Sequence, residues 1–396
     1  MTELLDHYDV VIIGGAVMGS STAYWLTESP DFDGTILVIE PDPTYEKSST
    51  TLSAASIRHQ FSNPVNIALS QFGTEFVKDF AARVEVDGDA PSLGFRETGY
   101  MFCATDAGLP ALRRNVEIQQ SCGADIQLHT PAEVADRFPY LNVDDLAGCS
   151  FGNTGEGTLD AYSLLMGFRQ RARHNGAVYC TDRAVGLGID QERITTVELA
   201  SGRKIGCTEV VNAAGPRAQR IARLAGLQLP VEPRKRTIFV FHCRTPIEAR
   251  FPLTIDITGV HFRTDPPHYV AGGVPKPDTE VGDDDFAVAR DEWEDQVWPA
   301  LANRVPVFEE VGLKRAWAGH YAYNTLDQNA VIGRAAEVPN FIFANGFSGH
   351  GLQQSAGVGR GVSELIIHGN YQTLDLNPLG PDRIGRNEPF LESAII

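Results

Sequence analysis

Two turns and one loop of this chain carry residue types that can bind phosphates or a small anion. The first turn, Gly14-Gly15-Ala16-Val17-Met18-Gly19, follows the apolar run 10–13 and precedes small and apolar residues at helical spacing. Glycines let the backbone approach a pyrophosphate closely, and the N-terminus of the following helix offers unpaired N–H groups. Glu40 ends a second apolar strand, about 20 positions further on, where a carboxylate can accept from ribose hydroxyls.

This pattern predicts a strand, turn, helix and strand over residues 10–39 that bind a dinucleotide. Ala16 stands where the usual fingerprint has its middle glycine, so one methyl group lies at the closest approach to the phosphates. The alternative is a buried β-α-β turn without a ligand. Glu40, followed by Pro41, disfavours a 2′-phosphate, and this favours FAD or NAD over NADP.

The loop, residues 45–61, is rich in hydroxyls and poor in charge until it reaches Arg58 and His59. Such a loop can pack closely against a ligand, although a solvated surface loop remains the alternative. Arginine and histidine side chains in a dry pocket can hold a carboxylate. We therefore expect the loop to pack against a ligand.

The second turn, Gly346-Phe347-Ser348-Gly349-His350-Gly351, lies between a predicted strand at 340–345 and a predicted helix at 352–367. A second helix N-terminus can meet the other end of an extended cofactor. The alternative is a capping or hairpin turn. Further apolar strands are predicted at 176–179, 194–199 and 209–215, and the last ends in the small residues Ala213, Ala214 and Gly215.

Composition sets limits on these interpretations. The chain has 396 residues and a formal net charge of −18, which disfavours nucleic acid as a partner. Its 43% hydrophobic and 21% charged residues are typical of folded domains. The six cysteines show no metal-ligand spacing, so we expect free thiols and no metal. The acidic N-terminus and the lack of a long apolar run predict a cytoplasmic protein without a membrane span.

These segments together resemble the D-amino acid oxidase superfamily of FAD-dependent oxidoreductases, in its sarcosine oxidase, glycine oxidase and dimethylglycine dehydrogenase-like branch. The resemblance rests on residues 11–19, 48–61, 211–215, 317–327 and 346–354. It implies an α/β (α+β) fold in which a Rossmann-like FAD-binding domain is interleaved with a substrate domain built on a large antiparallel sheet. The expected FAD-binding domain comprises residues 1–85, 150–230 and 325–396, and the substrate domain residues 86–149 and 231–324.

The resemblance implies oxidation of the C–N bond of a small amino acid or N-substituted amino acid, with hydride transfer to flavin and hydrolysis of the resulting imine. The expected catalytic residues are Arg58, His59, Tyr321, His350 and Gln353. Further candidates for holding the substrate are Tyr323, His261, Arg263 and His268. The expected FAD contacts are Gly14, Gly15, Ala16, Val17, Met18, Gly19, Glu40, Pro41, Ser48, Ser49, Thr51, Leu52, Ser53, Val185, Ala213, Ala214, Gly215, Gly346, Gly349, His350, Gly351, Leu352 and Gln353.

The chain departs from that branch at several positions. His320 and Ser53 stand where relatives carry the cysteine or histidine that attaches flavin covalently, so noncovalent FAD is expected. Gln353 replaces a lysine that binds the substrate carboxylate, and a neutral amide cannot supply that charge. Strand 268–272 has Val270 where sarcosine oxidases have the lysine that promotes reaction with oxygen. The electron acceptor is therefore either oxygen or a partner protein.

Three other functions stay open at this point. The flavoenzyme could oxidise a 2-hydroxy acid, it could serve mainly to bind and assemble partner proteins, or the chain could be a plain NAD dehydrogenase. Residues 234–236 (Arg-Lys-Arg) are interpreted as a solvated turn that enters a strand. A cluster that binds an anionic substrate is the alternative, and it would suit two or more carboxylates, whereas Arg58 alone would suit one.

Overall fold

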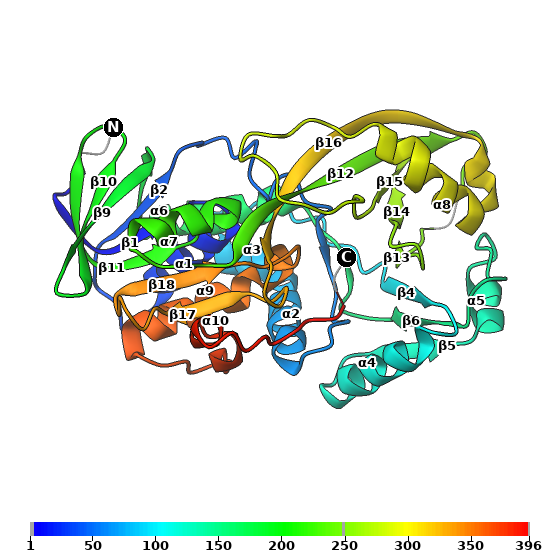
Figure 1. Ribbon diagram of the computed structural model, residues 1–396, viewed down its shortest axis with the longest axis horizontal. Coiled ribbons are helices and arrows are strands. Elements are labelled where there is room, and N and C mark those ends of the chain that lie inside the picture. Colours follow the sequence, from blue (N-terminus) through cyan, green and yellow to red (C-terminus); the bar gives the residue numbers. More distant parts are fainter. Residues whose placement is uncertain (1–3, 248–249, 395–396) are drawn as a thin grey trace.

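Two eight-stranded sheets form the framework, as the computed structural model shows for residues 4–247 and 250–394 (Figure 1). The first sheet has the strand order β17-β18-β11-β1-β2-β8. These strands are β1 (His7–Ile13), β2 (Ile36–Glu40), β8 (Val178–Thr181), β11 (Lys204–Asn212), β17 (Val331–Arg334) and β18 (Phe341–Asn345). β1 pairs in parallel with β2 and β11, so the ends of these strands meet at one edge, where ligands bind in such sheets.

Helices α1 (Val17–Glu28) and α9 (Gly351–His368) pack against each other beside this sheet (Figure 1). Their close approach depends on small residues, because a Cβ on Gly359 would lie 2.2 Å from the Ser21 hydroxyl. The Trp25 indole N–H donates to the Ala356 carbonyl at 2.8 Å across the same contact. The helices that follow the two glycine turns are thus held together.

The other elements of this half complete the sheet and its cover. β9 (Ala184–Asp190) and β10 (Arg193–Leu199) extend it in antiparallel pairing beside β11. The remaining helical segments are α2 (Pro64–Lys78), α3 (Phe80–Val84), α6 (Ala161–His174), η1 (Gly215–Arg217), α7 (Ala218–Leu224), η4 (Asn377–Leu379) and α10 (Asp382–Gly385). The short strands β3 (Ser56–Ile57) and β7 (Gly157–Thr158) pair with each other.

The second sheet, here called the roof sheet, has the order β16-β12-β15-β14-β13-β4-β6-β5. Its strands are β4 (Tyr100–Ala104), β5 (Ile126–His129), β6 (Gly148–Gly152), β12 (Val231–Cys243), β13 (Leu253–Ile255), β14 (His261–Asp265), β15 (His268–Gly272) and β16 (Val311–Asn324). All its pairs are antiparallel except β4 with β13. The helical segments of this half are α4 (Leu109–Ser121), α5 (Pro131–Arg137), η2 (Trp293–Val297), α8 (Trp298–Arg304) and η3 (Pro306–Glu309).

The predicted fold class is confirmed by this pair of sheets. The predicted domain limits stay a prediction, and β6 crosses one of them because residues 148–152 all belong to the roof sheet. The interpretation of residues 234–236 as a solvated turn is wrong, because these residues lie within β12. Arg236 is buried there and pairs with Asp278 at 2.7 Å, while Lys235 pairs with Asp285 at 2.8 Å.

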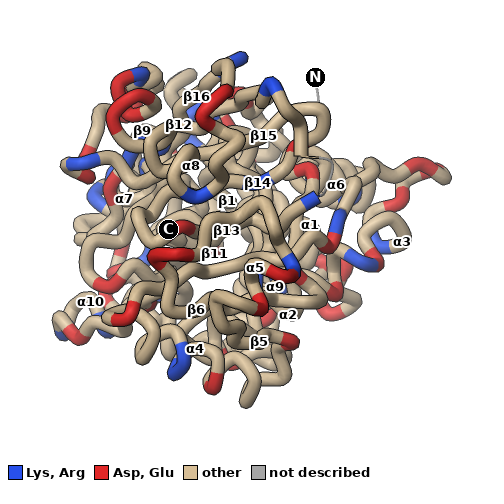
Figure 2. The backbone as a smooth tube through the Cα atoms, turned by 90° about the vertical axis from the view of Figure 1, so that its right-hand side faces the viewer, with Lys and Arg blue, Asp and Glu red and all other residues tan. Residues whose placement is uncertain are grey.

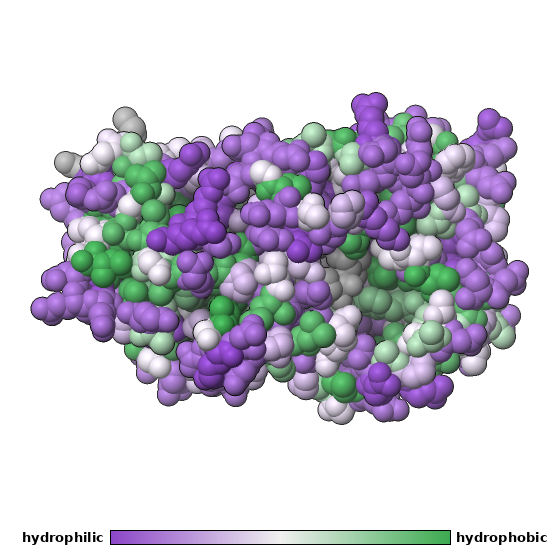
Figure 3. Space-filling model, viewed as in Figure 1, coloured by the Kyte–Doolittle hydropathy of each residue, from purple (hydrophilic) through white to green (hydrophobic). Residues whose placement is uncertain are grey.

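The surface agrees with the composition. Acidic and basic positions are scattered around the chain in Figure 2. Figure 3 shows mostly hydrophilic residues on one face, with a recess right of centre that has hydrophobic residues in its wall. Among the described residues, none of the helices combines the length and the apolar character that crossing a bilayer requires.

Candidate active site

A pocket lies where the segment around β3, the turn before α9 and the roof sheet meet. Its lining therefore combines residues far apart in the sequence. They are Ser53, Ala54, Ala55, Ser56, Arg58, Tyr100, Leu253, His261, Tyr321, Ser348, Gly349, His350, Leu352 and Gln353. Four of the five predicted catalytic residues are in this set, namely Arg58, Tyr321, His350 and Gln353.

Arg58 carries the positive charge of the pocket. The residue is 3% exposed, yet the recorded partners of its guanidinium within the described chain are backbone carbonyls and not carboxylates. Two of its N–H groups donate to the backbone carbonyls of Gln60 and Ala394, and the guanidinium carbon lies 3.9 Å from the centre of the Phe61 ring. A buried cation without a directly paired carboxylate is costly, and a carboxylate ligand would supply that partner.

Gln353 helps to hold Arg58 in place. Its Oε1 atom accepts from the Arg58 backbone N–H at 2.7 Å. The side chain also lines the pocket. Gln353 therefore supports the backbone of Arg58.

Two histidines of the pocket have unsatisfied ring nitrogens. Neither nitrogen of His261 has a hydrogen-bond partner among the described residues, nor does Nε2 of His350. Burial, with the charges of Arg263 and Arg236, lowers the pKa of His261 to about 4. Burial, with the charge of Arg58, lowers the pKa of His350 to about 3. Both rings are therefore neutral at pH 7 and can hydrogen-bond to a ligand.

Two tyrosines complete the polar part of the lining. Burial raises the pKa values of Tyr100 and Tyr321, so both hydroxyls stay protonated at neutral pH. The Tyr321 ring lies 4.8 Å from the guanidinium carbon of Arg236, which in turn pairs with Asp278. The neighbouring cation is thus neutralised, and Arg58 is the free cation within the lining.

The structure does not bring His59, Tyr323, Arg263 or His268 into the pocket lining. The His59 ring bonds to the Thr74 hydroxyl at 2.8 Å on α2, away from the lining. Its neighbour Arg58 faces the pocket, because successive side chains of an extended segment point to opposite sides. Tyr323 stacks under Arg234, and its hydroxyl accepts from Gln328 at 2.7 Å.

Glu156 is a functional candidate that the sequence analysis missed. Its carboxylate is fully buried and accepts from the His59 backbone N–H at 2.6 Å and the Gln60 amide at 2.9 Å. Burial raises the pKa of Glu156 to about 7, although these hydrogen bonds and the charge of Arg58 oppose the shift. The local sequence, a glutamate between two glycines, contains no pattern that predicts a buried carboxylate.

The first glycine turn has the geometry of a phosphate site. Helix α1 starts after Ala16, which provides no side-chain cap, and the Val17 N–H at its start donates to the Thr50 hydroxyl at 3.4 Å. A helix N-terminus of this kind favours a bound anion. Gly14 has φ +104°, and a Cβ there would lie 2.4 Å from the Ala213 carbonyl oxygen. Glu40 accepts from the Gly15 N–H at 2.9 Å and stands at the edge of this turn.

The second turn has corresponding features. Helix α9 starts after His350 without a side-chain cap, and Gly349 has φ +99° with the Tyr321 ring against it. The hydroxyl-rich loop packs on β16, where Ser49 donates to the His320 carbonyl at 2.6 Å. Of the other predicted FAD contacts, Val185 is exposed on β9. The roles of all these residues toward a cofactor remain predictions.

The structure also shows the surroundings of His320 and Val270, where the sequence departs from the sarcosine oxidase pattern. The His320 ring bonds to the Asp285 carbonyl at 2.7 Å and stacks on Phe286 at 4.2 Å between ring centres. Val270 is buried in an apolar cluster with Ile238 and Val240, against which Ala54 and Trp317 pack. No lysine is among the residues that line the pocket.

Comparison with known proteins gives a consistent picture. A family profile described as "FAD dependent oxidoreductase" matches residues 9–365. The chain is 38% identical to FAD-dependent oxidoreductase domain-containing protein 1 of Xenopus laevis, over 99% of this chain and 85% of that protein. It is 26% identical to human mitochondrial sarcosine dehydrogenase, over 91% of this chain but only 40% of that protein.

Solved structures agree with these matches. L-proline dehydrogenase from P. horikoshii superposes with a TM-score of 0.85 at 27% identity and covers 98% of this chain and 100% of that one. Glycine oxidase from Geobacillus kaustophilus, at 20% identity, shares the fold with a TM-score of 0.80. The two uncapped helices, the close glycine turns and the unsatisfied His350 nitrogen fit an extended FAD lying from the first turn to the second.

Proposed function

The chain belongs to the family of FAD-dependent oxidoreductases, and from that premise we propose that it oxidises the C–N bond of a small amino acid or N-substituted amino acid with one carboxylate. Noncovalently bound FAD would accept the hydride, and the resulting imine would hydrolyse. The protein has to bind the carboxylate, exclude water and present the carbon next to nitrogen to the cofactor. Relatives named sarcosine dehydrogenase and L-proline dehydrogenase support a secondary amine as the substrate.

The observation that carries this proposal is the buried Arg58 guanidinium without a carboxylate partner in the described chain. A substrate carboxylate would be the missing counter-ion, and a charge-assisted pair with arginine is strong in a dry pocket. Arg234 and Arg236, on strand β12 of the roof sheet, already pair with Asp278. One free cation supports a monocarboxylate over a dicarboxylate.

The neutral polar groups support a substrate nitrogen that is not charged when it reacts. An amine must carry its lone pair to form the imine, and a nearby guanidinium disfavours an ammonium group. His261 and Tyr321 line the same pocket, and both stay neutral at pH 7. His261, with two unsatisfied ring nitrogens, can hydrogen-bond to the substrate amine without adding charge.

The absence of a lysine from the pocket lining supports slow reaction with oxygen and transfer of the electrons to a partner protein. Val270, which the resemblance places at the oxygen-promoting lysine of sarcosine oxidases, lies in an apolar cluster of the roof sheet. Admission of air to the reduced protein tests this part. Reoxidation that keeps pace with turnover would contradict it.

The proposal is tested by anaerobic titration of the flavin-loaded protein with secondary amino acids, primary D- and L-amino acids and 2-hydroxy acids. We expect the visible flavin absorbance to bleach with one class of amine. Bleaching by 2-hydroxy acids alone would replace the proposal with the hydroxy-acid alternative. No bleaching by any of the compounds would favour a role in binding and assembling partners.

Variants of Arg58 test the site itself. Arg58→Met removes the counter-charge, so we expect kcat/KM for the best substrate to fall roughly 100-fold. Arg58→Lys keeps the charge but loses the planar fork and should fall less. Arg315→Met is the matched control, because Arg315 is exposed on β16 of the same roof sheet. Equal kinetics of Arg58→Met and Arg315→Met would contradict the assignment.

A further inference from the structure

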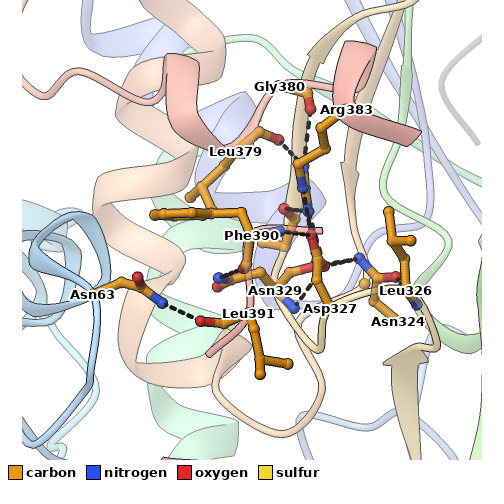
Figure 4. A network of polar contacts seen from close by, with 12 residues as sticks. Asn63, Asn324, Leu326, Asp327, Asn329, Leu379, Gly380, Arg383, Phe390 and Leu391 are labelled. Atoms are coloured by element: carbon orange, nitrogen blue, oxygen red, sulfur yellow. Dashed lines mark hydrogen bonds and ion pairs between the residues drawn. The ribbon is translucent and has the colours of Figure 1, made fainter. Parts of the chain in front are cut away.

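A buried ion pair fixes the segment that follows α10. Arg383 donates from Nε to Asp327 at 2.6 Å, and neither side chain is appreciably exposed. The same carboxylate accepts from the Phe390 backbone N–H at 3.0 Å, and Asn329 donates to the Phe390 carbonyl at 2.6 Å (Figure 4). Residues 390–394 are here called the strap, and the strap is therefore anchored at its first residue, Phe390.

The strap then reaches α2 through Glu392. This carboxylate is fully buried, and its recorded partners among the described residues are hydroxyl, amide and backbone N–H groups and not cations. It accepts instead from the backbone N–H groups of Ser62 and Asn63, at 2.8 and 3.2 Å, and from the Asn66 amide at 2.9 Å. Helix α2 has no cap from its own N-cap residue, Asn63, so Glu392 provides the cap from more than 300 residues away.

Hydrogen bonds also keep this carboxylate ionised. Burial by itself would raise the pKa of Glu392, but the bonds from Ser62 and Asn66 outweigh it and hold the pKa below its usual value. Glu392 also accepts from the Ala394 backbone N–H at 2.9 Å. The bend of the strap between these two residues is thus set by the same carboxylate.

That bend places the Ala394 carbonyl at Arg58. The carbonyl accepts from Nη2 of the guanidinium, while the Gln60 carbonyl accepts from Nη1. Arginine has five N–H donors, so two of them are fixed by backbone and the others stay available to a ligand. Both fixing groups are linked to Glu392. The Gln60 carbonyl is two residues before Ser62, which donates to Glu392, and the Ala394 N–H donates to the same carboxylate.

We propose that Glu392 is a positioning residue, which acts through the Ala394 carbonyl and the start of α2 to hold the Arg58 guanidinium in the orientation that receives the substrate carboxylate. This inference rests on the proposed function, since it assigns Glu392 to the same site. Glu392 lies outside the pocket lining. Its effect should therefore appear in carboxylate binding and not in the chemical step.

Glu392→Gln tests this with the flavin-loaded full chain. The amide keeps the size of the side chain but brings an NH₂ group toward the donors of Asn63 and Asn66. We expect KM for the amino acid substrate to rise roughly tenfold while kcat stays within about twofold. The Kd of a nonreacting carboxylate, acetate, read from the change in the flavin spectrum, should rise by the same factor. Glu388→Gln, exposed and paired only with Arg386, is the control.

The outcomes separate the two proposals. If acetate and amino acids fail to bind wild-type protein, the proposed function fails and the role of Glu392 fails with it. If they bind wild type and Glu392→Gln equally, or if kcat falls as much as KM rises, only the positioning role is overturned. If Glu392→Gln does not fold, Ala394→Pro replaces it, because proline removes the N–H that bonds to Glu392 and keeps the carbonyl. An unchanged Kd in Ala394→Pro would likewise overturn the role.

Discussion

The buried carboxyl of Glu156 should make the free energy of unfolding depend on pH, and Glu156→Gln should remove that contribution. Its pKa is raised from 4.5 to about 7, mainly by burial. Between these pH values the folded protein keeps a proton that the unfolded chain releases, so the free energy of unfolding must fall as the pH rises. A pKa change from 4.5 to about 7 corresponds to roughly 3 kcal/mol, and the full penalty is present above pH 7.

The assay is urea unfolding of wild type and Glu156→Gln at several pH values from 5 to 8. Buried His59 and His261, with pKa values lowered to about 4, contribute stability that rises with pH between about 4 and 6.5. They do so equally in both proteins, so the difference between the two curves isolates Glu156. We expect that difference to move by about 2–3 kcal/mol in favour of the variant as the pH rises.

The control is Glu117→Gln, which removes the same charge from an exposed position on α4. Its difference from wild type should not vary with pH by more than about 0.5 kcal/mol. A Glu156→Gln difference that is the same at pH 5 and pH 8 would show that the carboxyl titrates as it does in water. The argument from burial would then be wrong.

Two further predictions concern the glycine turn before α9 and the anchor of the strap. Gly349→Ala places a Cβ 2.4 Å from the Tyr321 ring at φ +99°, so the purified variant should lose most of its flavin absorbance. The control Gly226→Ala is strained at φ +73° but makes no contact, so it should keep its flavin. Equal flavin contents in the two variants would contradict the role of the turn. Arg383→Met leaves Asp327 buried without its partner and should cost about 3–5 kcal/mol in urea unfolding. Arg386→Met, on an exposed residue of the same segment, should cost under about 0.5 kcal/mol; similar costs for both would refute the importance of the buried pair.

The glycine turns and their helices could be predicted because their signals are local. Gly14 and Gly349 each follow an apolar strand and precede a helix, and both occupy positive φ values. The family resemblance then directed attention to Arg58 and Gln353, and both line the pocket. What these predictions share is that a short window of sequence contains the whole pattern.

The residues that could not be predicted depend on contacts between distant segments. Glu392 caps a helix that begins at Pro64, and no pattern in either segment indicates the other. Tyr100 reaches the pocket because β4 pairs with β13 in the roof sheet. Adjacency in the sequence predicts one site for Arg58 and His59, but the extended backbone directs their side chains to opposite sides.

The residues 234–236 illustrate a different limit. Their charge suggested a solvated turn or an anion site, and the sequence contains no local sign of the acids that pair with them. Asp278 and Asp285 come from the segment after β15 and neutralise Arg236 and Lys235. Sequence patterns report which charges exist, whereas the fold decides which of them remain free.

The most direct test of the central claim is anaerobic flavin reduction by one secondary amino acid and by the corresponding amine without its carboxylate, in wild type and Arg58→Met. If the carboxylate binds at Arg58, wild-type protein should prefer the acid by roughly 100-fold in the second-order rate constant, and Arg58→Met should lose that preference. Equal rates with both compounds in wild type, or an unchanged preference in Arg58→Met, would contradict the account.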